Sequence, residues 1–141
     1  MPRVDADELR RIGYLLFEQI GCAPADARTV VDHLVDSSLY GHDSHGQIRI
    51  YEYIGQIRDG IFDPKGRPYV ESDRPCAAVV NGGGALGQIG GAFATQLAID
   101  KAEQHGVATV TLRNTSHVGR VGAYPLQIAR AGLVGIVFCN T

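Results

Sequence analysis

The sequence predicts a mixed α/β fold, in which three N-terminal helices precede the strands and helices of a sheet domain. Apolar residues recur at helical spacing from Leu9 to Ile20 and again from Ala27 to Leu39. After residue 75 the pattern changes to short apolar runs, separated by stretches long enough for helices. This strand–helix–strand–helix–strand order implies helices packed against a sheet.

Residues 1–60 carry start and stop signals for the three helices. Asp5, with a glutamate three positions later, fits a capping box in which its carboxylate accepts a hydrogen bond from a free backbone N–H. Pro24 suits the first turn of the second helix, where no N–H is needed. The third helix is expected to span residues 44–59, with its isoleucines facing inward and Gly60 ending it.

The rest of the chain divides into a connector and the first part of an α/β domain that binds cofactor and substrate, at residues 76–141. Residues 61–75 are rich in proline, so they are predicted to form a connector with room for one short edge strand. The sheet domain has predicted strands at 76–81, 107–112 and 134–139, and predicted helices at 91–105 and 120–131. Because the last strand runs almost to the C-terminus, we expect a truncated chain or one piece of a split protein.

Composition argues against several classes of protein. The chain has 141 residues, 45% apolar and 20% charged content and a formal net charge of −2, which are ordinary values for a globular protein. It has no cluster of basic residues for a nucleic-acid surface, no signal-peptide pattern and no membrane-length apolar run. Its three cysteines are far apart and form no CxxC pair, so we expect free thiols, no metal site and a cytoplasmic protein.

A glycine-rich turn after the first predicted strand matches GxGxxG at Gly82, Gly84 and Gly87. In a Rossmann unit such glycines let the backbone approach a pyrophosphate at a helix N-terminus. The acidic residue that should end the next strand and bind the ribose is missing, because that strand ends at Arg113 and Asn114. A turn of small residues that permits close helix packing is the favoured interpretation, and a Rossmann-type nucleotide-binding module stays the alternative.

Two polar segments are not needed to build this fold. His45, Arg49 and Tyr53 are four residues apart, so they fall near one stripe of the predicted helix, where an arginine fork would match a carboxylate. A solvated helix face, with Ser44 as a simple cap, is the alternative. His117 follows the second strand directly, where ligand sites of open α/β sheets lie, and an imidazole suits proton transfer near neutral pH.

These segments resemble the malate/L-lactate dehydrogenase family, whose members include ureidoglycolate, L-sulfolactate and Δ1-piperideine-2-carboxylate enzymes. The likeness covers essentially the whole chain and rests on Asp43-Ser44-His45-Gly46-x-x-Arg49, Gly60-x-x-x-Pro64, Asn114-x-Ser116-His117-x-Gly119-x-x-Gly122-x-Tyr124, Gly135-Ile136 and Asn140-Thr141. The resemblance implies a fold unlike the Rossmann fold, NAD or NADP as the cofactor, and a homodimer.

The resemblance also implies roles for individual residues. His117 would be the catalytic acid/base, and Arg49 would hold the substrate carboxylate. Ser44 and His45 match the active-site Ser-His pair of the family and would add hydrogen bonds around the carboxylate and the nicotinamide. The implied substrate contacts are Arg49, Tyr53 and Ser44, and the implied cofactor contacts are His45, Asn140 and Thr141.

The function expected from the sequence is hydride transfer between NAD(P) and a small 2-hydroxy or 2-oxo acid, without nucleic acid or membrane partners. Family members are far longer, and most of their cofactor-binding segments would lie beyond residue 141. We therefore expect the chain alone to be a poor enzyme that associates with a second copy or with a missing C-terminal piece. The remaining alternative is a non-catalytic piece that folds only with a partner chain.

Overall fold

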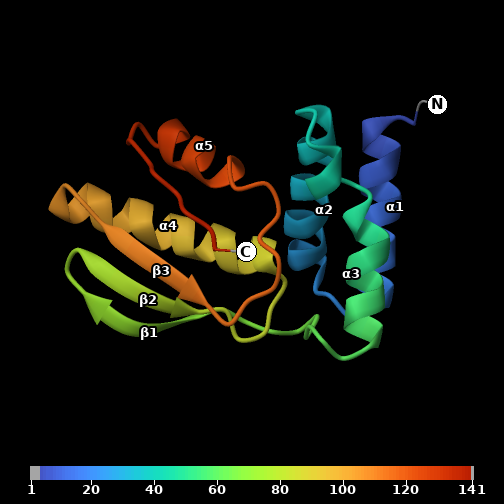
Figure 1. The fold of residues 1–141 in the computed structure, drawn as a ribbon, viewed down its shortest axis with the longest axis horizontal. Helices are drawn as coiled ribbons and strands as arrows, with labels where there is room; N and C mark the ends of the chain where they lie inside the picture. Colours follow the sequence, from blue (N-terminus) through green and yellow to red (C-terminus); the bar gives the residue numbers. More distant parts are fainter. Residues whose placement is uncertain (1–3, 141) are drawn as a thin grey trace.

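The structure, a computed structural model, describes residues 4–140 as a helical bundle beside a small helix-covered sheet (Figure 1). The bundle consists of α1 (Ala6–Gln19), α2 (Pro24–Leu39), the short 3-10 helix η1 (Asp43–His45) and α3 (Arg49–Arg58). The sheet part consists of β1 (Tyr69–Arg74), β2 (Ala77–Asn81), α4 (Gly87–His105), β3 (Thr109–Arg113) and α5 (Ala123–Arg130). The predicted mixed α/β class is confirmed.

The first two helices begin as their sequence signals predict. The Asp5 carboxylate caps α1 by accepting hydrogen bonds from the backbone N–H groups of Asp7 (2.9 Å) and Glu8 (3.1 Å). The Glu8 side chain pairs with Arg11 instead of reaching back to complete the capping box. Pro24 occupies the first turn of α2, where its missing N–H costs no helical hydrogen bond.

The third helix is shorter than the predicted span of 44–59. Gly46 lies so close to α2 that a Cβ there would be 2.1 Å from the Oγ of Ser38. That same Oγ accepts a hydrogen bond from the backbone N–H of Gln47, at 3.1 Å. The chain is thereby tied to α2 and turns before α3 begins at Arg49, so Ser44 is not the cap of a continuous helix.

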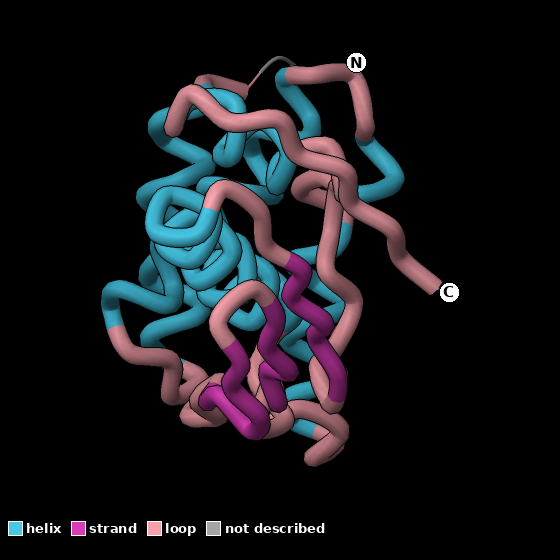
Figure 2. The backbone as a smooth tube through the Cα atoms, turned by 90° about the vertical axis from the view of Figure 1, so that its left-hand side faces the viewer, coloured by secondary structure: helices cyan, strands magenta, loops and turns pink. Residues whose placement is uncertain are grey.

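The three strands lie side by side in the order β1-β2-β3 (Figure 2). β2 and β3 are parallel and are joined by α4, which packs against both, whereas β1 is an antiparallel edge strand within the predicted connector. α4 begins at Gly87 rather than near Gly91, because its glycines permit close packing. A Cβ at Gly91 would lie 2.4 Å from the ring of Tyr124 in α5.

The predicted strand at 134–139 is wrong. The segment has an alternating pattern, with Val134, Ile136 and Phe138 between 77% and 97% exposed, but it forms no sheet ladder. It runs against α5 instead, since the Leu133 N–H donates to the Ile128 carbonyl and Gly135 packs against the Ile128 side chain. Alternation shows which residues share a face, but a strand also needs a backbone partner.

The main core connects the bundle to the sheet domain. Its fully buried members include Phe17 of α1, Leu34 of α2, Tyr53 of α3 and Leu86, the residue that precedes α4. The N-terminus of α4 therefore lies against the bundle and brings the buried face of α3 next to the loops of the sheet. None of the helices in residues 4–140 has the length and apolar character that crossing a bilayer requires.

Candidate active site

The loop after β3 carries His117 and is fixed by polar contacts at its start. Asn114 has a left-handed backbone (φ 53°), and its side-chain amide donates to the Asn81 side-chain oxygen at the end of β2, at 2.8 Å. Ser116 is buried, and its Oγ accepts the backbone N–H of Gly87 at the start of α4, at 2.7 Å. These contacts hold His117 beyond the carboxyl ends of the two parallel strands, where open α/β sheets place their ligands.

His33 of α2 fixes the far side of the same loop. Its Nε2 accepts the backbone N–H of Arg120 at 2.8 Å, and a Cβ at Gly119 would lie only 2.3 Å from that nitrogen. Burial, with a contribution from the positive charge of Arg120, lowers the pKa of His33 to about 4. His33 is therefore neutral at physiological pH and remains an acceptor.

His117 is held from the protein side by two buried residues. The Oη of Tyr53 lies 2.7 Å from Nδ1 of His117, and the Nε2 of Gln88 donates to the same Oη at 2.9 Å. Tyr53 is 0% and Gln88 1% exposed, whereas the His117 ring is half-buried. One ring nitrogen is therefore engaged within the protein, and Nε2 is the nitrogen left for a ligand.

Tyr53 was expected to contact the substrate, but its side chain is fully buried in this structure. Its hydroxyl lies behind the His117 ring and has no exposed surface with which to meet a ligand. The predicted stripe placed Tyr53 on a polar helix face, but Tyr53 packs into the core that α2 residues form with Leu86. Burial raises the pKa of Tyr53, so the residue is a neutral phenol.

Ser44 and His45 lie on the open side of the cluster. The Oγ of Ser44 is 2.9 Å from Nδ1 of His45, and the ring centroids of His45 and His117 are 5.2 Å apart. Burial, followed by the positive charge of Arg49 and by His45, lowers the pKa of His117, while Glu52 opposes the change. At neutral pH the His117 ring is therefore uncharged.

Arg49 lies at the first turn of α3, beside these imidazoles. Its Nε donates to the Ser44 carbonyl at 2.7 Å, and its Nη1 pairs with the Glu52 carboxylate. No hydrogen bond engages Nη2 among the described residues, so this side of the half-buried fork is left for an anion. The structure thus gathers Ser44, His45, Arg49 and His117 into one cluster, with Tyr53 behind it.

Only one of the two residues expected at the cofactor from the C-terminal end, Asn140, lies among the described residues. Asn140 is exposed, and its carbonyl accepts a weak hydrogen bond from Sγ of Cys139, at 3.7 Å. Thr141 lies outside the described residues. Residues 134–139, which were expected to form a strand that ends at Asn140, do not join the sheet. Strand geometry therefore does not place Asn140 at the cofactor.

Sequence reasoning missed Gln88 and His33. Gln88 lies in a run of glycine, alanine and isoleucine on the buried side of α4, and a polar residue in such a run was the available signal. His33 has apolar neighbours at helical spacing in α2, and only its contact with a loop 87 residues further along the chain reveals its role.

The GxGxxG turn has no free glycine donors for a pyrophosphate. The N–H groups of Gly82 and Gly84 donate to the carbonyls of Arg113 and Asn114, and those of Gly83 and Gly87 donate to side-chain oxygens. Arg113, at the end of β3, pairs with Glu71 of β1. The turn is a packing element, which argues against the Rossmann-type alternative.

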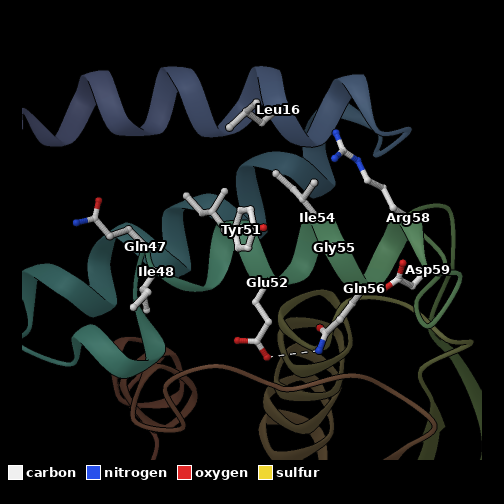
Figure 3. A pocket seen from close by; sticks show the side chains of 11 residues that line it. Leu16, Gln47, Ile48, Tyr51, Glu52, Ile54, Gly55, Gln56, Arg58 and Asp59 are labelled. Carbon is white, nitrogen blue, oxygen red and sulfur yellow. Dashed lines mark hydrogen bonds between the residues drawn. The ribbon is translucent and has the colours of Figure 1, made fainter.

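A separate groove of about 750 Å³ lies along the other side of α3. α1 and α3 run side by side there, with Leu16 of α1 and Tyr51, Ile54 and Arg58 of α3 among its lining residues (Figure 3). The groove contains none of the imidazoles of the cluster. The groove is thus separate from the candidate site, which is the half-buried cluster around His117.

Comparison with known proteins decides the family. The family model of malate/L-lactate dehydrogenase matches residues 4–141. The chain belongs to the malate/L-lactate dehydrogenase family. The resemblance expected from the Ser-His and Asn-x-Ser-His segments is thereby confirmed, and the reaction class of the relatives becomes relevant to the cluster.

Relatives of several named activities are similar to this member of the family. Hydroxycarboxylate dehydrogenase B of Escherichia coli (strain K12) is 37% identical over 138 residues, which are 98% of this chain and 38% of the relative. L-sulfolactate dehydrogenase of Methanocaldococcus jannaschii is 35% identical over 126 residues, 89% of this chain and 37% of the relative. The solved malate dehydrogenase of Pyrococcus horikoshii OT3 superimposes with a TM-score of 0.90 at 34% identity, covering 93% of this chain and 38% of that one. The chain thus spans less than two-fifths of the length of these relatives.

Proposed function

We propose that this chain forms the acid–base and carboxylate-binding side of an enzyme that transfers hydride between a nicotinamide cofactor and a small 2-hydroxy or 2-oxo acid. The observation that carries the proposal is the placement of His117. Its Nδ1 is held by Tyr53, while its half-buried ring lies beside His45 and the positive charge of Arg49. Membership of a family whose relatives are named as dehydrogenases supports this reaction class.

His117 performs the proton transfer in this proposal. During oxidation of a 2-hydroxy acid, its Nε2 takes the hydroxyl proton as hydride leaves C2, and in the reverse direction its imidazolium returns that proton to the forming alkoxide. The lowered pKa of His117, caused first by burial and then by Arg49, favours the neutral form that accepts the proton. General acid–base help of this kind contributes about a hundred- to ten-thousand-fold.

Arg49 and Ser44 hold the substrate carboxylate. The Nη2 of Arg49 and the exposed hydroxyl of Ser44 lie on the open side of the cluster, so they are available to an anion that approaches His117. A carboxylate bound there is neutralised by the guanidinium, and C2 next to it is directed toward the imidazole. The acid group is thus the feature by which this site would select its substrates.

The open side of the cluster also fits a nicotinamide. The half-buried His45 ring offers a flat surface, and the Ser44 hydroxyl offers a donor and an acceptor for a carboxamide. NAD or NADP, when bound, supplies or accepts the hydride. The residues of this chain would hold only the ring end, because the glycine turn has its N–H donors engaged.

The proposal is tested by the choice of substrate. The chain is assayed alone and fused to the remaining part of the E. coli relative, with NADH or NADPH and with 2-oxo acids of increasing size. Each acid is paired with its amide as the matched control. We expect saturable reduction of acids and not of amides in the fused form. No turnover in either form, or equal turnover of acids and amides, would contradict the proposal.

A further inference from the structure

The side chain of Gln88 is an unusual feature behind the active-site cluster. It is 1% exposed, and its Nε2 donates to the Tyr53 hydroxyl at 2.9 Å. Its Oε1 is buried and has no hydrogen-bond partner among the described residues. A buried amide oxygen without a hydrogen-bond donor is costly. This cost favours a second orientation of the amide, in which the oxygen accepts a hydrogen bond.

The amide of Gln88 fixes the direction of the hydrogen bonds that reach His117. Because Tyr53 accepts from Gln88, the one hydroxyl hydrogen of Tyr53 is available for Nδ1 of His117, 2.7 Å away. A neutral His117 then carries its proton on Nε2. In this arrangement Nε2 is occupied and is unable to take a proton from a substrate hydroxyl.

A half-turn of the amide reverses this direction. Oε1 then accepts from the Tyr53 hydroxyl, and Tyr53 in turn accepts from a proton on Nδ1 of His117. Nε2 of His117 is left with its lone pair, and Oε1 of Gln88 gains a donor while the amide N–H of Gln88 gives up its bond to Tyr53. The same arrangement also serves the imidazolium, because Nδ1 carries a proton both before and after Nε2 receives one.

We infer that Gln88 is a positioning residue that acts through Tyr53 to set which ring nitrogen of His117 carries the proton. The inference rests on the proposed acid–base role of His117 and adds a residue that touches neither substrate nor cofactor. Gly119 lies beside the amide without a side chain, and a Cβ there would be 3.0 Å from the Nε2 of Gln88, so glycine leaves this space open to the amide. Because Gln88 is buried, its amide responds to the hydrogen bond it makes rather than to solvent.

Other charged and titratable groups act on His117 without passing through Nδ1. Arg49 and Glu52 act from α3 and His45 acts from η1, whereas His33 of α2 is neutral near pH 7. Their influence is electrostatic and does not depend on a hydroxyl at residue 53. This difference makes the role of Gln88 separable, because removal of the Tyr53 hydroxyl should abolish the effect of Gln88 and leave the effects of these groups.

The test follows the His117 ring by ¹⁵N NMR in the 141-residue chain, where no turnover is needed. Gln88→Met keeps the length of the side chain but offers no acceptor to Tyr53. We expect the titration midpoint of His117 to move to lower pH. In the imidazolium form Nδ1 donates to Tyr53, and the Tyr53 hydroxyl then needs an acceptor that methionine does not offer. Gln88→Glu, which returns an acceptor, should move the midpoint back or to higher pH and favour the tautomer protonated on Nδ1. Gln96→Met, on the exposed side of α4, is the matched control.

The decisive comparison repeats Gln88→Met in a Tyr53→Phe background, where the shift should vanish. A midpoint and tautomer in Gln88→Met equal to those of the Gln96→Met control would overturn the inference, as would a shift that persists without the Tyr53 hydroxyl. If Gln88→Met does not fold, the test uses Gln88→Glu instead. An unchanged His117 tautomer in Gln88→Glu would also overturn the inference. Failure of the hydride-transfer proposal would appear in turnover and would leave these NMR results standing.

Discussion

The hydroxyl oxygen of Tyr53 lies 2.7 Å from Nδ1 of His117, although 64 residues separate the two in the chain. Tyr53 belongs to the buried face of α3, and His117 belongs to the loop that follows β3. The contact therefore depends on how the helical bundle meets the sheet domain. It fixes one side of the histidine ring and leaves the other side to ligands. The proposed chemistry therefore depends on the contact between the helical bundle and the sheet domain.

Tyr53→Phe should destabilise the chain. The change removes the partner of the buried Gln88 amide and of Nδ1 of His117, and an unsatisfied buried polar group costs about 1–3 kcal/mol. The free energy of unfolding in urea should fall by this amount. Tyr51→Phe, at a position 89% exposed on the same helix, is the control and should change the free energy by less than about 0.5 kcal/mol. Equal stability of the two variants would show that the Tyr53 contact contributes little.

Arg49→Lys should weaken the binding of 2-oxo acids although the charge is kept. A lysine ammonium is a point charge without the planar fork, and it also loses the bond from Nε to the Ser44 carbonyl. We expect KM for the acid to rise about tenfold or more, with a smaller change for the amide. Arg58→Lys, on an exposed turn of the same helix, serves as the control. If Arg49→Lys and Arg58→Lys behave alike, Arg49 is only a surface charge.

Gly87→Ala should disturb the His117 loop. A Cβ at this position would lie 2.3 Å from the His117 carbonyl oxygen and 2.5 Å from that of Ser116, so the backbone itself would have to move. We expect a loss of about 1–3 kcal/mol in unfolding free energy, as for other overpacked sites. Gly55→Ala on α3 meets nothing within 4 Å and should be neutral or stabilising by up to about 1 kcal/mol. Thermal melts of both variants check this contrast, and a neutral Gly87→Ala would mean that the loop is loosely held.

His33 should make the chain sensitive to mild acid. Its folded-state pKa, lowered to about 4 by burial and then by Arg120, lies below the usual value of 6.5 that applies when it is unfolded. Between these values the unfolded chain binds a proton that the folded chain does not, so stability is present above pH 6.5 and falls as the pH drops toward 4. The contribution is on the order of 3 kcal/mol.

His33→Gln is the variant that checks this pH dependence. Glutamine keeps an acceptor for the Arg120 N–H but does not titrate. The urea midpoint of this variant should fall less than that of the unmodified chain between pH 6.5 and 4, whereas His105→Gln, an exposed position, should follow the unmodified chain. Parallel pH curves for all three chains would remove His33 from this role.

The sequence predicted local structure well and long-range contacts poorly. The caps at Asp5 and Pro24 are local devices, and the structure confirms both. The start of α3 depends instead on the contact of Gly46 with Ser38. The path of residues 134–139 depends on their contact with Ile128 of α5. Neither contact can be read from a local sequence pattern. Similarly, the spacing of Arg49 and Tyr53 indicated a shared helix but did not reveal that only the tyrosine would be buried in the core.

The central claim, that His117 moves the proton of the substrate hydroxyl, is tested most directly by His117→Ala. The measurement is kcat for reduction of a 2-oxo acid, together with NADH affinity, in the chain extended by the remaining part of the E. coli relative. His105→Ala, which removes an exposed histidine of α4, is the control. We predict that kcat falls by about a hundred- to ten-thousand-fold while NADH affinity changes little. A loss in kcat of less than about tenfold, or a loss matched by His105→Ala, would contradict the assignment of His117 as the acid–base group.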